Sequence, residues 1–362
     1  MCSMIVSETT RPPSDERLAV RYPAPLKPGD LIAVTSPSSG VAEAMRPRLE
    51  FCLEHLRKRG YRAVVGSCMD GTGITSAPAA ARAAELTEML SDPQVRAVVP
   101  PWGGEGALEL LSLLDFDRIG AAEPTWLVGY SDTSTLMLPL TLRTGVATVH
   151  APNLMDTPYR VPDPLTDWLD VVAAPAGSRF TQGSCALYRG GEMVNFKDNP
   201  TTLDWELTTP GCWKRLPSAA APGPVRASGR LIGGCLETMA MLPGTPFGDV
   251  SGFTDLYAPE GLIVYLEVAE SGALAAARLL HHVRLAGWLD AANAVLIGRS
   301  GAPGDRGFTQ LDALESALGD LAVPVLYDVD FGHVPPQLAL VNGALATVEF
   351  DGTTGSLTQH LT

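Results

Sequence analysis

A serine stands at a position where a short apolar strand is expected to turn directly into a helix. The segment is Trp126-Leu-Val-Gly-Tyr-Ser131-Asp132-Thr-Ser-Thr-Leu. A serine at such a turn projects its hydroxyl from the sheet edge, and the next N–H lies at the helix start, where it can stabilise an oxyanion. The pattern favours Ser131 as a nucleophile and the Asp132 N–H as an oxyanion donor. Because the second glycine of G-x-S-x-G is missing, the alternative is that Ser131 or Asp132 only caps the helix.

A serine hydroxyl becomes a good nucleophile only when a base takes its proton, and two histidines follow apolar runs that are typical of strands. His333 ends the run 323–333, so a core strand would carry it to a sheet edge. His150 follows the shorter run 146–149 and competes for the same role; otherwise it lines the pocket or satisfies a backbone carbonyl. We expect His333 to be the base.

The third member of such a site is a carboxylate that orients the imidazole and stabilises its charged form. Glu267 lies inside the nearly continuous apolar run 261–269, which is typical of a strand buried on both faces. An unpaired carboxylate there would be costly, so Glu267 needs a partner. That partner is either the catalytic histidine or, in a purely structural ion pair, Arg278 or Arg299.

A glycine-rich loop, Trp102-Gly103-Gly104-Glu-Gly106, follows the strand-like run 95–99 and precedes a helical pattern. Without Cβ atoms this backbone can turn its N–H groups toward an anion or oxyanion. The alternative is a tight turn without a ligand. The loop matches neither G-x-G-x-x-G nor the P-loop with its lysine, which disfavours nucleotide-phosphate binding by those fingerprints and a Rossmann-type oxidoreductase.

The elements that must position these residues alternate between strands and helices. Short apolar strands are predicted at 31–35, 61–65 and 95–99, with helices over 42–59 and 79–90 between them. This rhythm predicts an α/β fold with a parallel sheet, in which ligands gather at the carboxyl ends of the strands. The serine and the glycine loop both fall at that edge.

Composition excludes several classes of function. Acidic residues outnumber basic ones 40 to 26, and the net charge of −14 opposes nucleic-acid binding. No apolar stretch reaches the length of a signal peptide core or a membrane span, so we expect a soluble, cytoplasmic protein. The six cysteines form no C-x-x-C pair, and the adjacent His281 and His282 point in different directions on a helix. A metal site is therefore not predicted.

The order of these motifs resembles that of the LD-carboxypeptidase family of serine peptidases, which includes the microcin C immunity proteins. The matching segments are Val34-Thr-Ser-Pro37, Gly103-Gly104, Leu114-Asp-Phe-Asp117, Gly129-Tyr-Ser-Asp132, His150-Ala-Pro152, Gly229-Arg-Leu-Ile-Gly-Gly-Cys-Leu236, Gly244-Thr-Pro246, Leu266-Glu267, the Arg278 helix with Ala286-Gly-Trp-Leu289, Leu296-Ile-Gly298 and Asp330-Phe-Gly-His333. They span most of the chain.

The resemblance implies that Ser131, Glu267 and His333 form a catalytic triad, with the backbone N–H groups of Gly104 and Asp132 as the oxyanion hole. It also implies a mechanism without metal or organic cofactor, and commonly a homodimer.

For the fold, the resemblance implies an N-terminal Rossmann- or flavodoxin-like α/β domain with a parallel sheet and a smaller C-terminal α/β domain with a mixed sheet. The active site would lie between them. We expect a flexible tail over 1–24, the N-terminal domain over 25–165, a connecting segment with a substrate loop over 166–228, and the C-terminal domain over 229–362.

The substrate is expected to contact Gly103, His150, Trp205, Trp213 and Cys235. The long segment 185–228 with its two tryptophans is similar to the substrate loop of the immunity branch, because aromatic rings can stack on a nucleobase. This favours a peptidyl- or aminoacyl-nucleotide over the alternative, the L,D-peptide bond of a murein tetrapeptide. A non-catalytic protein that sequesters a small molecule is the alternative of another class.

Two positions depart from the family pattern. Val268 stands where many relatives carry Asp after the glutamate, and Cys235 replaces a frequent Asn. We expect the first to alter contacts of Glu267 and the second to alter a pocket contact, with catalysis retained.

Overall fold

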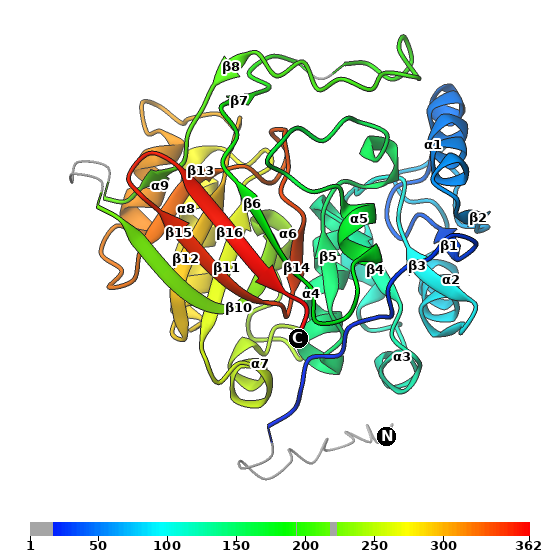
Figure 1. The fold of residues 1–362 in the computed structure, drawn as a ribbon, viewed down its shortest axis with the longest axis horizontal. Helices are drawn as coiled ribbons and strands as arrows, with labels where there is room; N and C mark the ends of the chain where they lie inside the picture. The colour runs from blue at the N-terminus through cyan, green and yellow to red at the C-terminus, as the bar shows by residue number, and fades with distance from the viewer. Residues whose placement is uncertain (1–16, 193, 218–222) are drawn as a thin grey trace, which may run out of the picture.

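Two β-sheets lie side by side and organise the chain. A computed structural model describes residues 17–192, 194–217 and 223–362. The first sheet has the strand order β14-β5-β4-β3-β1-β2, and the second has the order β6-β16-β15-β10-β11-β12-β13-β9 (Figure 1). A short hairpin, β7 with β8, stands apart from both.

The first sheet is parallel over β1 to β5. Its strands are β1 (Leu31–Val34), β2 (Arg62–Val65), β3 (Val95–Val98), β4 (Trp126–Gly129), β5 (Thr148–His150) and β14 (Leu340–Asn342). The intervening helices are η1 (Glu43–Met45), α1 (Arg46–Lys58), α2 (Ala79–Ser91), η2 (Ala107–Leu110), α3 (Phe116–Ala121), η3 (Ser131–Thr133), α4 (Ser134–Thr144), η4 (Leu154–Asp156) and α5 (Trp168–Ala173). The predicted alternation of strands and helices is confirmed, because each apolar strand needs a helix to cover it.

The second sheet is mixed. Its strands are β6 (Arg179–Gly183), β9 (Lys214–Arg215), β10 (Val225–Cys235), β11 (Leu262–Glu267), β12 (Ala292–Gly298), β13 (Val325–Val329), β15 (Leu345–Phe350) and β16 (Gly355–His360). The hairpin strands are β7 (Leu187–Tyr188) and β8 (Thr209–Pro210), and the helices are α6 (Leu236–Met239), α7 (Val250–Tyr257), α8 (Ala273–Leu285) and α9 (Gln310–Leu318). Strands β10 to β13 are parallel, whereas β6, β9, β15 and β16 pair antiparallel.

One strand from the C-terminal part of the chain joins the first sheet, so the sheets do not coincide with the predicted segments. The late strand β14 joins the first sheet, with Leu340 opposite His150. Strands β6 and β9, from the predicted connecting segment 166–228, form the two edges of the second sheet, and the boundary at 228/229 falls within β10. The two halves are therefore tied together by backbone hydrogen bonds as well as by side chains.

Helix α4 lies at the junction of the two sheets and follows directly after the Ser131 turn. All of its residues from Ser134 to Leu142 are buried, and it packs against β5 of the first sheet and β10 of the second. A helix that is apolar all round needs such a doubly covered position. The Ser131 turn is thus fixed between the two halves. Within the described ranges, no helix is both long and apolar enough to cross a membrane.

Candidate active site

Ser131 lies at a sharp turn between β4 and η3. Its backbone has a φ of +62°, in the left-handed region that costs an ordinary side chain about 1–3 kcal/mol. Strand β4 is fully buried, so the turn is held by its packing on one side and by α4 on the other. The strained turn directs the Ser131 hydroxyl away from the sheet and toward the second half of the chain.

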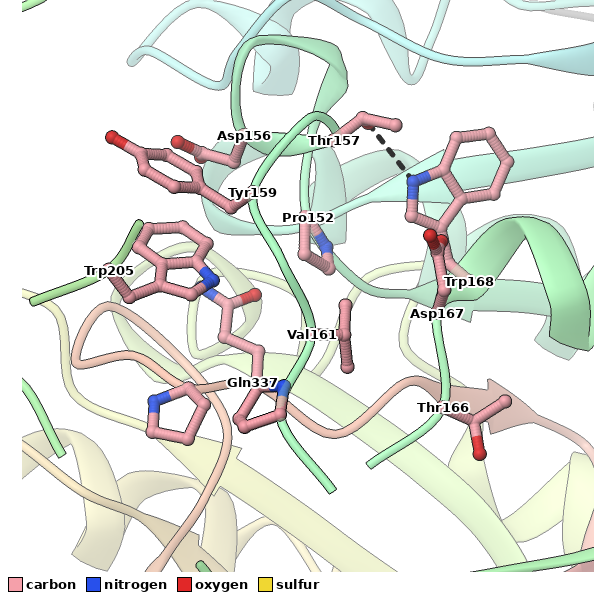
Figure 2. A pocket seen from close by; sticks show the side chains of 12 residues that line it. Pro152, Asp156, Thr157, Tyr159, Val161, Thr166, Asp167, Trp168, Trp205 and Gln337 are labelled. Atoms are coloured by element: carbon pink, nitrogen blue, oxygen red, sulfur yellow. Dashed lines mark hydrogen bonds between the residues drawn. The ribbon is translucent and has the colours of Figure 1, made fainter. Parts of the chain in front are cut away.

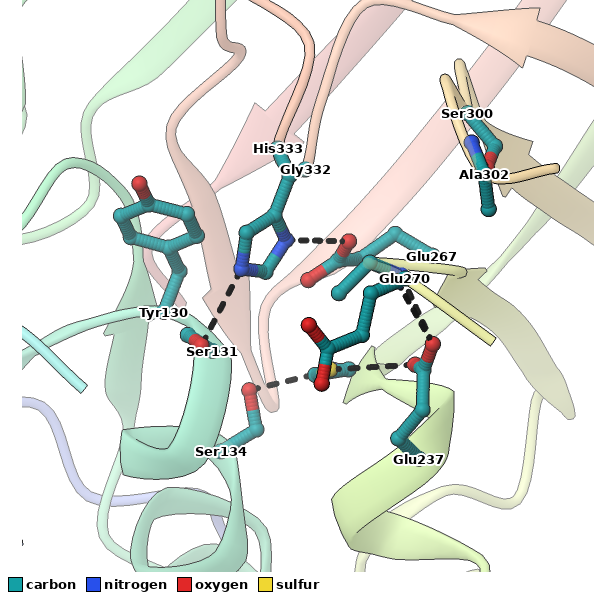
Figure 3. Close-up of polar contacts among 12 residues, drawn as sticks. Tyr130, Ser131, Ser134, Glu237, Glu267, Glu270, Ser300, Ala302, Gly332 and His333 are labelled. Atoms are coloured by element: carbon teal, nitrogen blue, oxygen red, sulfur yellow. Dashed lines mark hydrogen bonds and ion pairs between the residues drawn. The ribbon is translucent and has the colours of Figure 1, made fainter. Parts of the chain in front are cut away.

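His333 and Glu267 meet Ser131 at this point (Figure 3). The His333 Nε2 atom lies 3.1 Å from Ser131 Oγ, and its Nδ1 atom lies 2.8 Å from Glu267 Oε2. We call these three residues the serine–histidine–glutamate array. The sequence predicted that they lie together. Ser131 begins η3, Glu267 ends β11, and His333 lies in the loop after β13.

Glu267 and His333 each shift the pKa of the other toward the charged form. Burial raises the pKa of Glu267, but the charge and hydrogen bond of His333 lower it more, so the pKa lies below its ordinary value. Burial lowers the pKa of His333, but the Glu267 carboxylate prevails and the pKa lies above its ordinary value. The other oxygen of Glu267, Oε1, is buried and has no partner within the described part of the chain. Arg299, the alternative partner in an ion pair, bonds Asp330 instead.

The loop that carries His333 is anchored by Asp330. Its carboxylate pairs with Arg299 at 2.8 Å and accepts hydrogen bonds from the Trp213 indole N–H at 2.8 Å and the Cys185 N–H at 3.0 Å. Each of these groups is buried. Asp330 thereby fixes the backbone three residues before His333, which limits the positions open to the imidazole.

The glycine loop is clamped to the serine turn by the Asp132 side chain. The Asp132 carboxylate accepts hydrogen bonds from Ser38 Oγ at 2.5 Å, the Ala107 N–H at 2.9 Å and Thr135 Oγ1 at 3.1 Å. Burial raises the pKa of Asp132 even though these bonds lower it. The side chain therefore has a structural task, while the Asp132 N–H lies in the first turn of η3, where it has no intrahelical acceptor.

Gly103 and Gly104 allow the backbone of this loop to lie close to Ser131 and to the Ser38–Ser39 segment. A Cβ on Gly103 would lie 2.9 Å from Ser131 Oγ and 3.0 Å from the Asp132 nitrogen. Gly104 has a φ of +137°, which favours glycine, and a Cβ there would meet the Ser38 and Ser39 hydroxyls. The arrangement brings loop backbone beside the hydroxyl of Ser131, as an oxyanion hole requires.

His150 takes part in neither hydrogen bond of the serine–histidine–glutamate array. It is buried among aromatic rings, with its centroid 5.4 Å from Tyr265 and 6.2 Å from both Tyr130 and Phe331. Neither ring nitrogen has a hydrogen-bond partner among the residues described, and burial lowers the pKa of His150 to about 4. His150 is therefore a neutral, buried side chain, and it is His333 that lies within hydrogen-bond distance of Ser131.

The two tryptophans expected to contact the substrate are both enclosed. Trp213 is 1% exposed in the second core and bonds Asp330. Trp205 is 6% exposed and stacks on Tyr159 with a centroid separation of 3.7 Å (Figure 2). The pocket beside it has about 10 Å³, room for roughly one water molecule. A nucleobase cannot reach either ring here, because packing of the long segment uses both.

Cys235 lies at the end of β10 and is buried. Its N–H donates to Ser134 Oγ at 3.1 Å, and its thiol lies 3.3 Å from Glu237 Oε2. The other Glu237 oxygen accepts the N–H groups of residues 269–271. The backbone of Cys235 therefore ties the end of β10 to the start of α4, and the carboxylate of Glu237 supports the turn that follows Glu267.

A larger cavity opens next to His333. It has a volume of about 610 Å³, and its walls include Tyr188, Arg189, Lys214, Arg299 and His333. The sequence did not identify Tyr188 or Arg189 as site residues, because β7 is only two residues long and neither residue belongs to a recognisable motif. Their position in a loop that returns to His333 is visible only in three dimensions.

An activated serine beside backbone N–H donors can attack a carbonyl and stabilise the resulting oxyanion. An α/β fold with this array at the carboxyl ends of its strands is that of a hydrolase. The chain belongs to the LD-carboxypeptidase family: residues 32–151 match the LD-carboxypeptidase N-terminal domain, and residues 228–348 match the C-terminal domain.

Relatives support the same membership over nearly full length. A carboxypeptidase-named protein of Streptomyces coelicolor is 31% identical, over 93% of this chain and 95% of its own. The microcin C7 self-immunity protein MccF of Escherichia coli is 26% identical, over 93% of this chain and 95% of its own.

Solved structures show the shared fold. MccF in complex with aspartyl sulfamoyl adenosine superposes with a TM-score of 0.75 at 24% identity, covering 93% of this chain and 98% of that one. The muramoyltetrapeptide carboxypeptidase from Oxalobacter formigenes superposes with a TM-score of 0.67 at 19% identity, covering 91% of this chain and 98% of that one.

Proposed function

We propose that this peptidase hydrolyses the amide bond of a peptidyl- or aminoacyl-nucleotide, with Ser131 as nucleophile, His333 as general base and acid, and Glu267 as the orienting carboxylate. The observation that carries the proposal is the pair of hydrogen-bond distances, 3.1 Å from Ser131 to His333 and 2.8 Å from His333 to Glu267. Both are within the range in which a proton can be transferred.

The reaction follows from this geometry. His333 takes the Ser131 proton while the Oγ atom forms a bond to the substrate carbonyl, and the Gly104 and Asp132 N–H groups stabilise the oxyanion. His333 then gives the proton to the leaving nitrogen as the C–N bond breaks. Water, activated by the same imidazole, hydrolyses the acyl-enzyme and restores the serine hydroxyl. Glu267 stabilises the imidazolium in both halves of the reaction.

The size of the cavity beside His333 supports a nucleotide-like leaving group. Sites for ligands of drug size have roughly 300–1,000 Å³, and this cavity has about 610 Å³. A single D-amino acid would fill only a small part of it. The half-buried Tyr188, whose ring lies 4.3 Å from the Arg299 guanidinium, is the aromatic side chain in the cavity wall. MccF, a relative of this chain, has been solved with aspartyl sulfamoyl adenosine.

A second candidate is L,D-carboxypeptidase activity on a murein tetrapeptide. It is favoured by the cationic groups in the same cavity, because the leaving D-amino acid carries a carboxylate. The same three residues would perform the chemistry, so the two candidates differ only in the leaving group.

Mass-spectrometric hydrolysis of aspartyl sulfamoyl-adenosine and of an L,D-tetrapeptide tests the proposal directly. Wild type, Ser131→Ala and a matched control, Ser316→Ala on the exposed face of α9, should be compared. We expect cleavage of the nucleotide by wild type and the control, and none above background by Ser131→Ala. Cleavage of the tetrapeptide alone would favour the second candidate. Cleavage unaffected by Ser131→Ala would refute Ser131 as nucleophile, and tight binding without cleavage would indicate a sequestering protein.

A further inference from the structure

The cavity beside His333 contains three cationic side chains, and two of them are already neutralised. Lys214 Nζ lies 2.8 Å from Asp328 Oδ2, and Arg299 Nη2 lies 2.8 Å from Asp330 Oδ1. These pairs hold the cavity wall together and leave little charge for a ligand.

Arg189 is the third cation and differs from the others. It is only 9% exposed, yet among the residues placed by the structure no acceptor bonds its guanidinium and no carboxylate forms an ion pair with it. Its charge lowers the pKa of Asp156, whose carboxylate accepts the Tyr130 hydroxyl at 3.2 Å instead of pairing with the guanidinium. Unlike Lys214 and Arg299, Arg189 therefore has no carboxylate partner among the residues described, and its guanidinium can bind an anionic ligand.

The backbone fixes Arg189 close to the reacting atoms. Its N–H donates to the Pro335 carbonyl at 3.0 Å, two residues after His333. Its guanidinium lies over the Trp205 ring, 5.8 Å from the centroid, and the Trp205–Tyr159 stack supports that ring from the protein interior (Figure 2). The enclosed tryptophan thus supports the guanidinium of Arg189, a residue that lines the cavity.

The cavity lies on the His333 side of the serine–histidine–glutamate array, and this position indicates which part of the substrate Arg189 would bind. The acyl carbon must lie at Ser131, and His333 must give its proton to the leaving nitrogen. The leaving group therefore lies on the His333 side, in the cavity that His333 and Arg189 both line. The planar fork of an arginine fits a carboxylate or a phosphate-like group with two parallel hydrogen bonds.

We propose that Arg189 is a specificity-determining residue that binds an oxyanion on the leaving group of the substrate, a carboxylate or a phosphate-like group. This inference rests on the proposed function for its assignment to the leaving-group side. It also makes a claim that is independent of turnover: the free protein binds such anions through Arg189.

Kinetics with matched substrates test the inference. Wild type, Arg189→Lys, Arg189→Met and a control, Arg226→Met, should be compared; Arg226 is an exposed, ion-paired arginine outside this cavity. Each protein should be given two pairs of substrates. One pair is the tetrapeptide and its C-terminal amide; the other is aspartyl sulfamoyl-adenosine and the aspartyl amide of 5′-amino-5′-deoxyadenosine, which lacks the sulfamate. We expect Arg189→Met to lower kcat/KM on the anionic member of the cleaved pair by about 10- to 150-fold, the range for a lost hydrogen bond to a charged group. The neutral member should change by less than about 3-fold, and Arg189→Lys should be intermediate because it keeps the charge without the fork. Equal losses on both members would overturn the inference.

Equilibrium binding separates failure of this inference from failure of the proposed function. Calorimetric titration with AMP and with D-alanine requires no turnover, and thermal melts check that each variant is folded. We expect at least one of the two anions to bind wild type at least about 10-fold more tightly than Arg189→Met. AMP binding would identify a phosphate as the anion and D-alanine binding a carboxylate. Equal affinities of wild type and variant for both would overturn the inference, whether or not any substrate is cleaved.

Discussion

Substitution of Gly103 by alanine should insert a methyl group between the serine and the oxyanion donors. The added Cβ would lie 2.8 Å from Ser131 Cβ and 3.0 Å from the Asp132 nitrogen. Carbon atoms prefer separations of about 3.5–4.0 Å, so the loop or the serine must move apart by about 1 Å. The backbone of Gly103 does not have a positive φ, so the perturbation is steric rather than conformational.

The displacement predicts a large effect on catalysis and a moderate one on stability. A misplacement of about 1 Å costs roughly 10²-fold in rate, and loss of an oxyanion donor costs about 10²–10³-fold. We therefore expect Gly103→Ala to lower kcat by about 10²–10³-fold. Overpacking of this kind costs about 1–3 kcal/mol of unfolding free energy, which leaves most domains folded.

The assay is steady-state hydrolysis of the cleaved substrate together with urea denaturation. Gly73→Ala is the matched control, because its nearest contact would be the Thr75 carbonyl at an ordinary 3.4 Å and the residue is exposed. The control should keep wild-type kcat within about 2-fold, as surface substitutions change stability little. If folded Gly103→Ala retained kcat within about 3-fold of wild type, the glycine loop could not be part of the oxyanion hole.

Two further predictions concern the charges around the array. Glu267→Gln should lower kcat/KM by about 10³–10⁴-fold and move the acidic limb of its pH profile to lower pH. Glu267 raises the pKa of His333, and only the neutral imidazole, which accumulates above that pKa, can accept the serine proton. An acidic limb of the pH profile that did not move in Glu267→Gln would contradict this account. Asp330→Ala should lower the unfolding free energy by about 3–5 kcal/mol, because it removes the carboxylate that neutralises the buried Arg299 guanidinium. Lys214→Ala removes an exposed ion pair and should cost about 0–1 kcal/mol in the same urea titration, so equal losses would show that burial of the Asp330 pair is unimportant.

The sequence alone determined the local parts of the site. A buried strand followed at once by a helix defines the Ser131 turn, because strand, turn and helix patterns are encoded within a dozen residues. Glu267 could be identified because a carboxylate in an apolar run requires a partner. The glycines of the 102–106 loop indicated a close backbone approach for the same local reason.

Only the tertiary structure decided which distant residues complete the site. Both His150 and His333 follow apolar runs in the sequence, but His150 ends β5, where pairing with β14 encloses it. His333 lies in the loop after β13, which Asp330 anchors beside Ser131. Trp213 became a core residue and Arg189 a cavity residue through contacts more than a hundred residues apart in sequence. Such contacts depend on how the two sheets pack together, and no periodicity in the chain encodes that packing.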